Sequence, residues 1–186
     1  MEEINMYLDE AREMMGKALG HLKSELAKIR AGKASPSMLD SVMVEYYGTP
    51  TPLSQTASVT TPDARTIFIK PWEKKLITDI ERAIMNSDLG LNPQNDGEQV
   101  IINIPMLTEE RRIQLVKQAR AEGEHAKVSI RNIRKDTNDG LKQLQKDGMA
   151  EDDIKRAEDK VQQLTDEHTK KVDEILDRKE QDIMTV

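Results

Sequence analysis

The chain has 186 residues, a formal net charge of −6 and no cysteine. The lack of cysteine excludes a disulfide scaffold, a thiolate metal site and a cysteine nucleophile. With one Trp, three Tyr and one Phe, a large aromatic-rich β-sandwich core is not expected, whereas 33% charged and 37% hydrophobic residues are typical of long amphipathic helices.

The chain has no segment suited to a membrane or to secretion. No stretch approaches the roughly 20 apolar residues needed to span a bilayer. The first residues, Met1 to Asn5, are acidic and contain no apolar run, so they do not resemble a signal or transit peptide. We therefore expect a cytoplasmic protein that does not bind membranes.

The first segment is predicted to be a long helix. Its apolar residues recur at steps of three and four from Ile4 to Ile29, which is the stripe of a helix packed in a bundle. We expect the helix to end at Arg30, because Gly32 is suited to a helix C-terminus and Pro36 cannot continue a helix.

The middle of the chain follows another pattern. Residues 42–47 alternate with the period of a strand, and the run from Gly48 to Pro52 is expected to end it. Further strands are predicted at 66–70 and 100–104, with a short helix over 76–84 between them. The middle therefore predicts a small α/β domain with a β-α-β order.

Two more long helices follow. One is predicted over 108–146, and the other begins at Glu151 and keeps its apolar stripe to Ile183. The triplet 138–140, Asn-Asp-Gly, is by itself a hairpin signal. We nevertheless predict an uninterrupted helix, because Leu141 and Leu144 stay in phase with the stripe before the triplet.

The predicted fold is a two-domain α+β protein, in which the small domain is inserted between the first and second helices of an elongated three-helix bundle. The bundle takes residues 1–30 and 107–186, and the inserted domain takes residues 31–106. Two short crossings, 31–35 and 104–107, suggest a hinge, although a rigid protein with tight linkers would have the same pattern. The candidate hinge residues are Ala31, Gly32, Ser35, Pro36, Pro105 and Met106.

Basic residues are concentrated in the second long helix. From 111 to 135 there are eight basic and two acidic residues, whereas 136–186 contains nine basic and fifteen acidic residues. At about 100° per residue, Lys127, Arg131 and Arg134 fall within about 40° of Arg120. Seven of the eight, all but Arg111, are thus predicted to form a cationic ridge beside the buried face.

Such a ridge is suited to phosphate groups, because guanidinium groups donate in pairs to phosphate oxygens. So few aromatic residues disfavour stacking on single-stranded bases, so structured RNA contacted through its backbone fits better. Two alternatives remain open: a solvated helix face, or a chaperone-like coiled coil that binds an acidic protein. The RNA hypothesis requires the basic side chains to be exposed, and internal salt bridges would contradict it.

No catalytic motif is present, and we expect a protein that is not an enzyme and needs no cofactor or metal. The three histidines, at 21, 125 and 168, each lack a second ligand at the spacing of a metal site. There is neither a phosphate-binding glycine loop with a following Lys-Ser/Thr nor a Gly-x-Ser-x-Gly nucleophile motif.

Several long strings resemble the ribosome recycling factor family, and the resemblance covers essentially the whole chain. The most specific is IRAGKASPS at 29–37, which continues to VEYYGTPTPL at 44–53. SDLGLNP at 87–93, LTEERR at 107–112 and RNIRKD at 131–136 follow in the family's order.

The resemblance implies an L-shaped monomer that acts after termination. The bundle would bind large-subunit ribosomal RNA, and elongation factor G with GTP would move the small domain to split the subunits. Arg30, Arg112, Arg131 and Arg134 would be the principal RNA contacts. Lys33 and Lys135 replace the family's usual Arg and lose its paired donors.

A bacterial form is implied as well, since organellar relatives carry an N-terminal extension. Together, the ridge and the resemblance give these expected RNA-binding residues: Arg30, Lys33, Arg112, Lys117, Arg120, Lys127, Arg131, Arg134 and Lys135.

Overall fold

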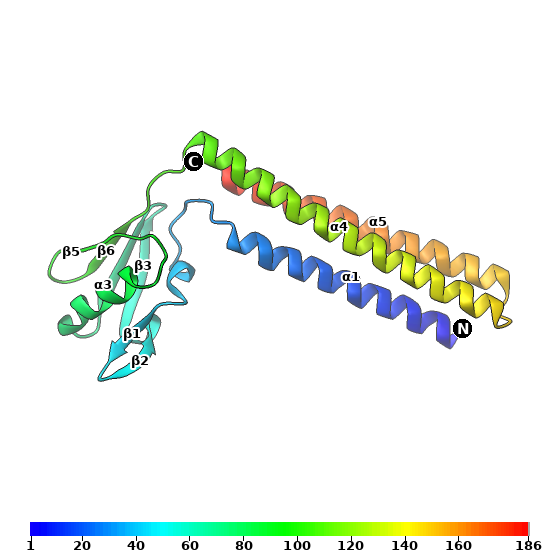
Figure 1. The fold of residues 1–186 in the computed structure, drawn as a ribbon, viewed down its shortest axis with the longest axis horizontal. Coiled ribbons are helices and arrows are strands. Elements are labelled where there is room, and N and C mark those ends of the chain that lie inside the picture. The colour runs from blue at the N-terminus through cyan, green and yellow to red at the C-terminus, as the bar shows by residue number, and fades with distance from the viewer. Residues whose placement is uncertain (186) are drawn as a thin grey trace. The chain divides into compact units, whose positions relative to one another are not determined.

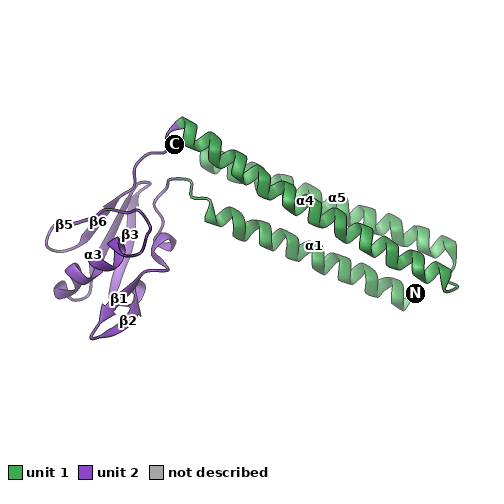
Figure 2. Cartoon of the chain, viewed as in Figure 1, with its two compact units in different colours: residues 1–31, 109–186 green, residues 32–108 purple. Residues whose placement is uncertain are grey.

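A computed structural model describes residues 1–185 and divides into two compact units (Figure 2). Unit 1 contains Met1–Ala31 and the chain from Glu109 onward, and unit 2 contains Gly32–Thr108. The expected boundaries, after residues 30 and 106, differ from these by one and two residues. The small unit is thus inserted within the sequence of the helical one.

Unit 1 is a three-helix bundle, as predicted. It consists of α1 (Glu2–Lys28), α4 (Glu109–Lys146) and α5 (Glu151–Met184). Figure 1 shows α4 running antiparallel to both α1 and α5. None of the helices within residues 1–185 is both long and apolar enough to span a bilayer.

The continuous helix predicted through the Asn-Asp-Gly triplet is confirmed, because α4 includes residues 138–140. Leu141 is fully buried and packs with Ile4, Leu8 and Ile154 at the end of the bundle where α1 begins. Turning the chain at the triplet would expose this cluster to water, so burial of the leucine overrides the local hairpin preference. The turn comes later, at Gly148, whose φ is +109°.

Two glycines let the helices of unit 1 approach closely. A Cβ atom at Gly123 of α4 would overlap the Leu176 side chain of α5, whose Cγ atom would lie 2.9 Å away. At Gly140 a Cβ atom would lie 2.9 Å from the Tyr7 Cζ atom of α1. These glycines lower the intrinsic helix propensity of α4, but they allow it to pack closely against both neighbouring helices.

Unit 2 is a small α+β domain with two sheets. A two-stranded hairpin pairs β1 (Met43–Tyr46) with β2 (Thr49–Pro52). The second sheet is antiparallel throughout, with the order β3-β4-β6-β5. Its strands are β3 (Ala57–Asp63), β4 (Thr66–Pro71), β5 (Pro93–Asn95) and β6 (Val100–Asn103).

Short helices complete unit 2. They are η1 (Pro36–Leu39), α2 (Leu53–Thr56), η2 (Lys74–Leu76) and α3 (Ile77–Met85). The core is formed by apolar residues of the sheet and of α3, among them Ile67, Ile69, Ile80 and Ile102, all fully buried. The strands predicted at 42–47, 66–70 and 100–104 correspond to β1, β4 and β6.

Three strands were not predicted. The first strand ends at Tyr46, before the run Gly48 to Pro52 as predicted, but that run also forms a turn and β2, which the sequence did not indicate. Prolines are tolerated there because each lies opposite β1 at a position that needs no hydrogen bond from β2. The short β5 and the polar β3, which contains Pro62, are the two edges of their sheet, where strands need less apolar character.

The β3–β4 turn holds both linkers of unit 2. The Ala34 N–H donates to the Ala64 carbonyl, and the Ile104 N–H donates to the Arg65 carbonyl, each at 2.7 Å. The Arg65 N–H in turn donates to Asp63 Oδ1 at 2.8 Å, a hydrogen bond that lowers the pKa of the Asp63 carboxyl. Chain entry and exit are therefore fixed to one turn of the sheet.

Gly123→Ala is expected to destabilise unit 1, because the added Cβ atom meets the branch carbon of Leu176, which rotation about χ2 cannot move. Overpacking of about 1–3 kcal/mol should exceed the gain of about 1 kcal/mol in helix propensity. Gly16→Ala is the matched control: nothing lies within 4 Å of its added Cβ atom, so it should stabilise the protein by about 0.5–1 kcal/mol. Urea unfolding followed by circular dichroism measures the free energy of unfolding of both variants. A change of the same sign in both would contradict the close-packing argument.

Candidate nucleic-acid interface

The basic side chains of α4 divide into two rows according to how they contact α5. The apolar stripe of α4, from Leu115 to Leu141, is buried against the other helices. One row of cations borders this stripe and contacts side chains of α5. The other cations have few contacts within the protein, and we call them the outer row.

The inner row forms a ladder of ion pairs with α5. Arg120 binds Glu180 with two hydrogen bonds, Nε to Oε1 at 2.6 Å and Nη2 to Oε2 at 3.3 Å. The Lys127 Nζ atom lies 2.7 Å from Asp173 Oδ1. The hydrogen bond from Arg120 to Glu180 raises the pKa of the guanidinium, which therefore stays charged.

Arg134 continues the ladder through an amide. Its Nη1 atom donates to Gln162 Oε1 at 3.4 Å, and Gln162 Nε2 donates to Asp166 Oδ1 at 2.9 Å. Arg134 thus has a long, neutral contact with α5 where Arg120 and Lys127 have ion pairs. We call Arg120, Lys127 and Arg134 the inner row.

The outer row consists of Arg112, Lys117, Arg131 and Lys135. Arg131 lies 3.9 Å from Glu124 at the far limit of an ion pair. Within residues 1–185 the other three side chains have neither an ion pair nor a hydrogen bond. Arg112 is half-buried, whereas Lys117, Arg131 and Lys135 are exposed. These four cations are available to an external anion.

The other two expected RNA-binding residues lie outside α4. Arg30 follows the end of α1 in unit 1, where it is exposed and has no ion pair with any described residue. Lys33 belongs to unit 2 and is half-buried. The structure therefore brings seven of the nine expected residues together on one helix, adds Arg30 in the same unit, and does not group Lys33 with them.

The expectation that the whole ridge is free of internal contacts was wrong for the inner row. The physical reason is the register of the antiparallel pair: Arg120, Lys127 and Arg134 are spaced by seven residues, and so are Asp166, Asp173 and Glu180. Residues seven apart share one face of a helix, so two such rows on antiparallel helices meet along their whole length. This matched spacing is a sequence signal that could have identified the ladder.

The ladder leaves part of the charge accessible. The Arg120 side chain remains 65% exposed although it is paired, whereas the Lys127 side chain is 26% exposed. Arg112 and Lys135 are 23 positions apart, which corresponds to about 35 Å along the helix. An array of this length is suited to several phosphates of one backbone rather than to a single small anion.

The described residues contain no candidate metal site. Over residues 1–185 no three His, Asp or Glu side chains are grouped so that they could hold a metal ion. His168 is buried, and its Nδ1 atom lies 2.7 Å from the Leu164 carbonyl oxygen of the same helix. The basic side chains of α4 are suited to binding an anion.

Comparison with known proteins points to one family. The family model described as "Ribosome recycling factor" matches residues 22–184. The ribosome-recycling factor of Cytophaga hutchinsonii is 56% identical over 186 residues, and that of Christiangramia forsetii is 59% identical, each covering all of both chains. The factor of Desulforamulus reducens is 48% identical over 96% of this chain and 97% of its own.

Two solved structures resemble this chain. A solution structure of the ribosome recycling factor has a TM-score of 0.78 and 34% identity, covering all of both chains. The second set is described as models for the T. thermophilus ribosome recycling factor and the E. coli elongation factor G bound to the E. coli post-termination complex. It has a TM-score of 0.62 and 46% identity over 97% of this chain and 98% of its own.

Glu180→Gln and Asp173→Asn each remove one carboxylate from the ladder with little change in side-chain size. Because all four partners are at least partly exposed, the pairs should contribute little to stability, and each variant should lower Tm by no more than about 3 °C. Thermal unfolding followed by circular dichroism measures this. A markedly larger decrease would indicate that the ladder, rather than the apolar stripe, holds α4 against α5.

Proposed function

Because the chain belongs to the ribosome recycling factor family, we propose that it is a translation factor that splits post-termination ribosomes together with elongation factor G and GTP. Full-length identity to curated relatives supports this function. The related structure described with elongation factor G on the post-termination complex supports the choice of partners. The protein would act in the cytoplasm as a monomer, and GTP hydrolysis would take place on elongation factor G.

We propose that the outer row of α4 docks on large-subunit ribosomal RNA. The observation that carries this step is the set of four basic side chains beside the ladder: within residues 1–185 three have no internal partner, and the fourth, Arg131, has only an ion pair at 3.9 Å with Glu124. An unpaired cation gains the full attraction of a phosphate on binding, whereas a paired cation must first lose its carboxylate or share it. Arg112, Lys117, Arg131 and Lys135 are therefore the principal proposed contacts, and Arg30 and Arg134 extend them.

The inner row is proposed to have a supporting role. Arg120 is bound to Glu180 through two nitrogen atoms, but its guanidinium keeps further N–H donors that face solvent. It can therefore approach a phosphate while remaining paired. Lys127 is more enclosed and would act through its charge rather than by direct contact. Lys33 remains a separate proposed contact from unit 2.

We also propose a hinge, which is narrower than the sequence suggested. Ser35 caps η1, because its Oγ atom accepts from the Ser37 N–H at 3.3 Å, and Pro36 is the first residue of that helix. The hydrogen bonds of Ala34 and Ile104 hold the chain to unit 2 at these points. Ala31, Gly32, Pro105 and Met106 therefore remain as hinge candidates, while Ser35 and Pro36 belong to the folded unit.

The double variant Arg131→Ala/Lys135→Ala should impair ribosome splitting and leave the fold intact. We expect affinity for purified large subunits to fall by roughly tenfold or more, and the slope of log K against log salt to fall by about two. Lys17→Ala is the control, because Lys17 lies on α1 and, among the described residues, pairs only with Glu13. Sedimentation measures binding, and light scattering with elongation factor G and GTP measures splitting. Binding that is unchanged at low salt would reject this docking face.

Glu180→Gln/Asp173→Asn should have the opposite effect, since it frees Arg120 and Lys127 from their carboxylates. The double variant should bind large subunits more tightly. The slope of log K against log salt should become steeper by up to about two. Sedimentation with large subunits at several salt concentrations measures both quantities. Unchanged affinity would remove the inner row from the interface, while tighter binding to acidic proteins and not to subunits would favour the coiled-coil alternative.

A further inference from the structure

The β1–β2 hairpin has one blocked edge and one open edge. Tyr46 pairs with Thr49 across a two-residue turn in which Tyr47 and Gly48 have φ of 49° and 78°. In such a turn the flanking pair exchanges both hydrogen bonds, and the ladder then alternates. Glu45 and Met43 therefore face Pro50 and Pro52 at positions without cross-strand hydrogen bonds.

This alternation decides what each edge can offer. On β2 the outward positions are the two prolines, which have no N–H to donate. On β1 the N–H and C=O groups of Met43 and Glu45 point away from β2. Within residues 1–185 the sheet has only these two strands, so no third strand of the described chain uses the outward groups of β1. The open edge belongs to β1 alone.

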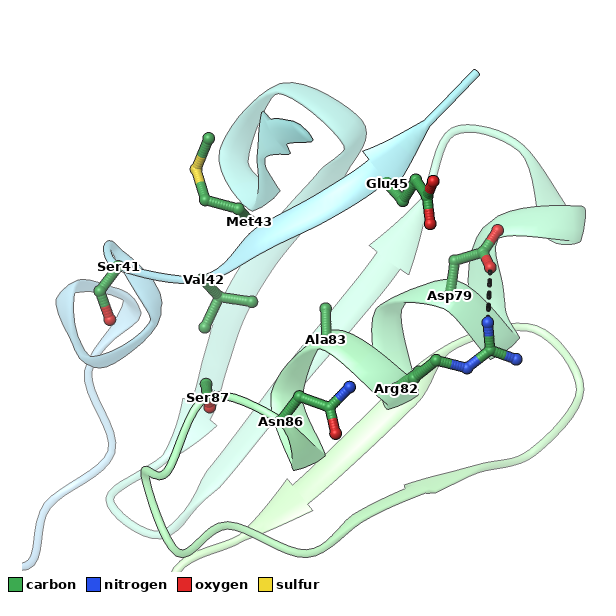
Figure 3. A pocket seen from close by; sticks show the side chains of 9 residues that line it. All are labelled: Ser41, Val42, Met43, Glu45, Asp79, Arg82, Ala83, Asn86 and Ser87. Atoms are coloured by element: carbon green, nitrogen blue, oxygen red, sulfur yellow. Dashed lines mark ion pairs between the residues drawn. The ribbon is translucent and has the colours of Figure 1, made fainter. Parts of the chain in front are cut away.

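The open edge of β1 borders a cavity of about 350 Å³, a volume typical of binding sites. Ser41, Val42, Met43 and Glu45 line one side of it. Figure 3 shows α3 on the other side. The α3 residues that line the cavity are 79, 82 and 83, which lie on one face of the helix, and Asn86, the residue at its C-terminal end, lines it as well.

The lining is mostly polar and contains two carboxylates, Glu45 and Asp79, and one guanidinium, Arg82. The Asp79 carboxylate pairs with Arg82 at 3.9 Å, shown dashed in Figure 3. Glu45 is exposed and has no ion-pair partner within residues 1–185. Unit 2 as a whole has nine acidic and six basic residues. The cavity therefore favours a basic occupant over an acidic one.

We propose that the open edge of β1 binds an extended, basic segment of a partner protein as an added strand. Backbone groups of that segment would pair with the N–H and C=O groups of Met43 and Glu45, about 4.8 Å away. Its lysine or arginine side chains would face Glu45, which has no ion-pair partner among the described residues. The proposal concerns unit 2 alone and does not depend on how unit 1 binds RNA.

The direct test uses a blocked peptide of about eight residues that alternates lysine and threonine, a strand-forming and basic sequence. Added to the full-length ¹⁵N-labelled protein, it should shift the amide signals of Ser41, Met43 and Glu45 and slow hydrogen exchange at Met43 and Glu45. The matched peptide of glutamate and threonine should bind at least tenfold more weakly. Shifts scattered over the surface, or equal affinity for both peptides, would overturn the proposal.

Met43→Pro removes an outward N–H without removing a β1–β2 hydrogen bond. It should weaken the lysine–threonine peptide roughly tenfold, whereas Met43→Thr, which keeps the N–H, should bind as the unsubstituted protein does. If a folded Met43→Pro protein bound the lysine–threonine peptide with wild-type affinity, the peptide could not be pairing with β1 as an added strand.

A charge pair tests the site even if Met43→Pro does not fold. Glu45→Lys should abolish peptide binding, whereas Glu98→Lys, which makes the same charge change in unit 2 but outside the cavity lining, should leave most of it. Equal losses in both variants would mean attraction to overall charge and would contradict a defined site. No ribosome is used in these measurements, so their failure would not affect the proposed recycling function.

Discussion

Close packing of α4 against α5 is the constraint on which the candidate interface depends. Gly123 lets the backbone of α4 approach Leu176, and the small side chains of Ala119 and Ala126 lie on the same stripe. At this separation the residues that border the stripe on both helices must face each other. The apolar contact therefore determines which cations of α4 meet carboxylates of α5, and consequently which cations remain for a ligand.

The resulting charge pattern explains how an acidic protein can present a cationic surface. The chain has a net charge of −6, yet the acidic residues of α5 that face α4 are largely engaged in the ladder. They pair with Arg120 and Lys127 of the inner row and hold these long side chains against α5. The outer row is left as a line of charge along a rigid helix, and rigidity matters because several phosphates can be bound at once only if the cations keep their spacing.

In unit 2, backbone hydrogen bonds determine where the chain enters and leaves the domain. Its two linkers are fixed to the β3–β4 turn through Ala64 and Arg65, so the chain enters and leaves the domain at one place. Its hairpin shows a second use of backbone groups, since two prolines remove the donors from one edge while the other edge keeps them beside the α3 cavity. Edge strands that are left open are prone to pairing, and here charged and polar side chains restrict what can pair.

The sequence alone determined the three long helices, the insertion between the first two and the location of the basic residues. Helix-period stripes and local charge are properties of neighbouring positions, so they can be read without knowing the partner of each residue. It did not predict β2, β3 or β5, because strands at sheet edges owe their pairing to other strands rather than to their own apolar character. Only the tertiary structure decided that Arg120 and Lys127 are paired while Lys117 and Lys135 are not. The physical reason is that an ion pair depends on which faces of two helices meet, and that is set by packing between residues about fifty or sixty positions apart.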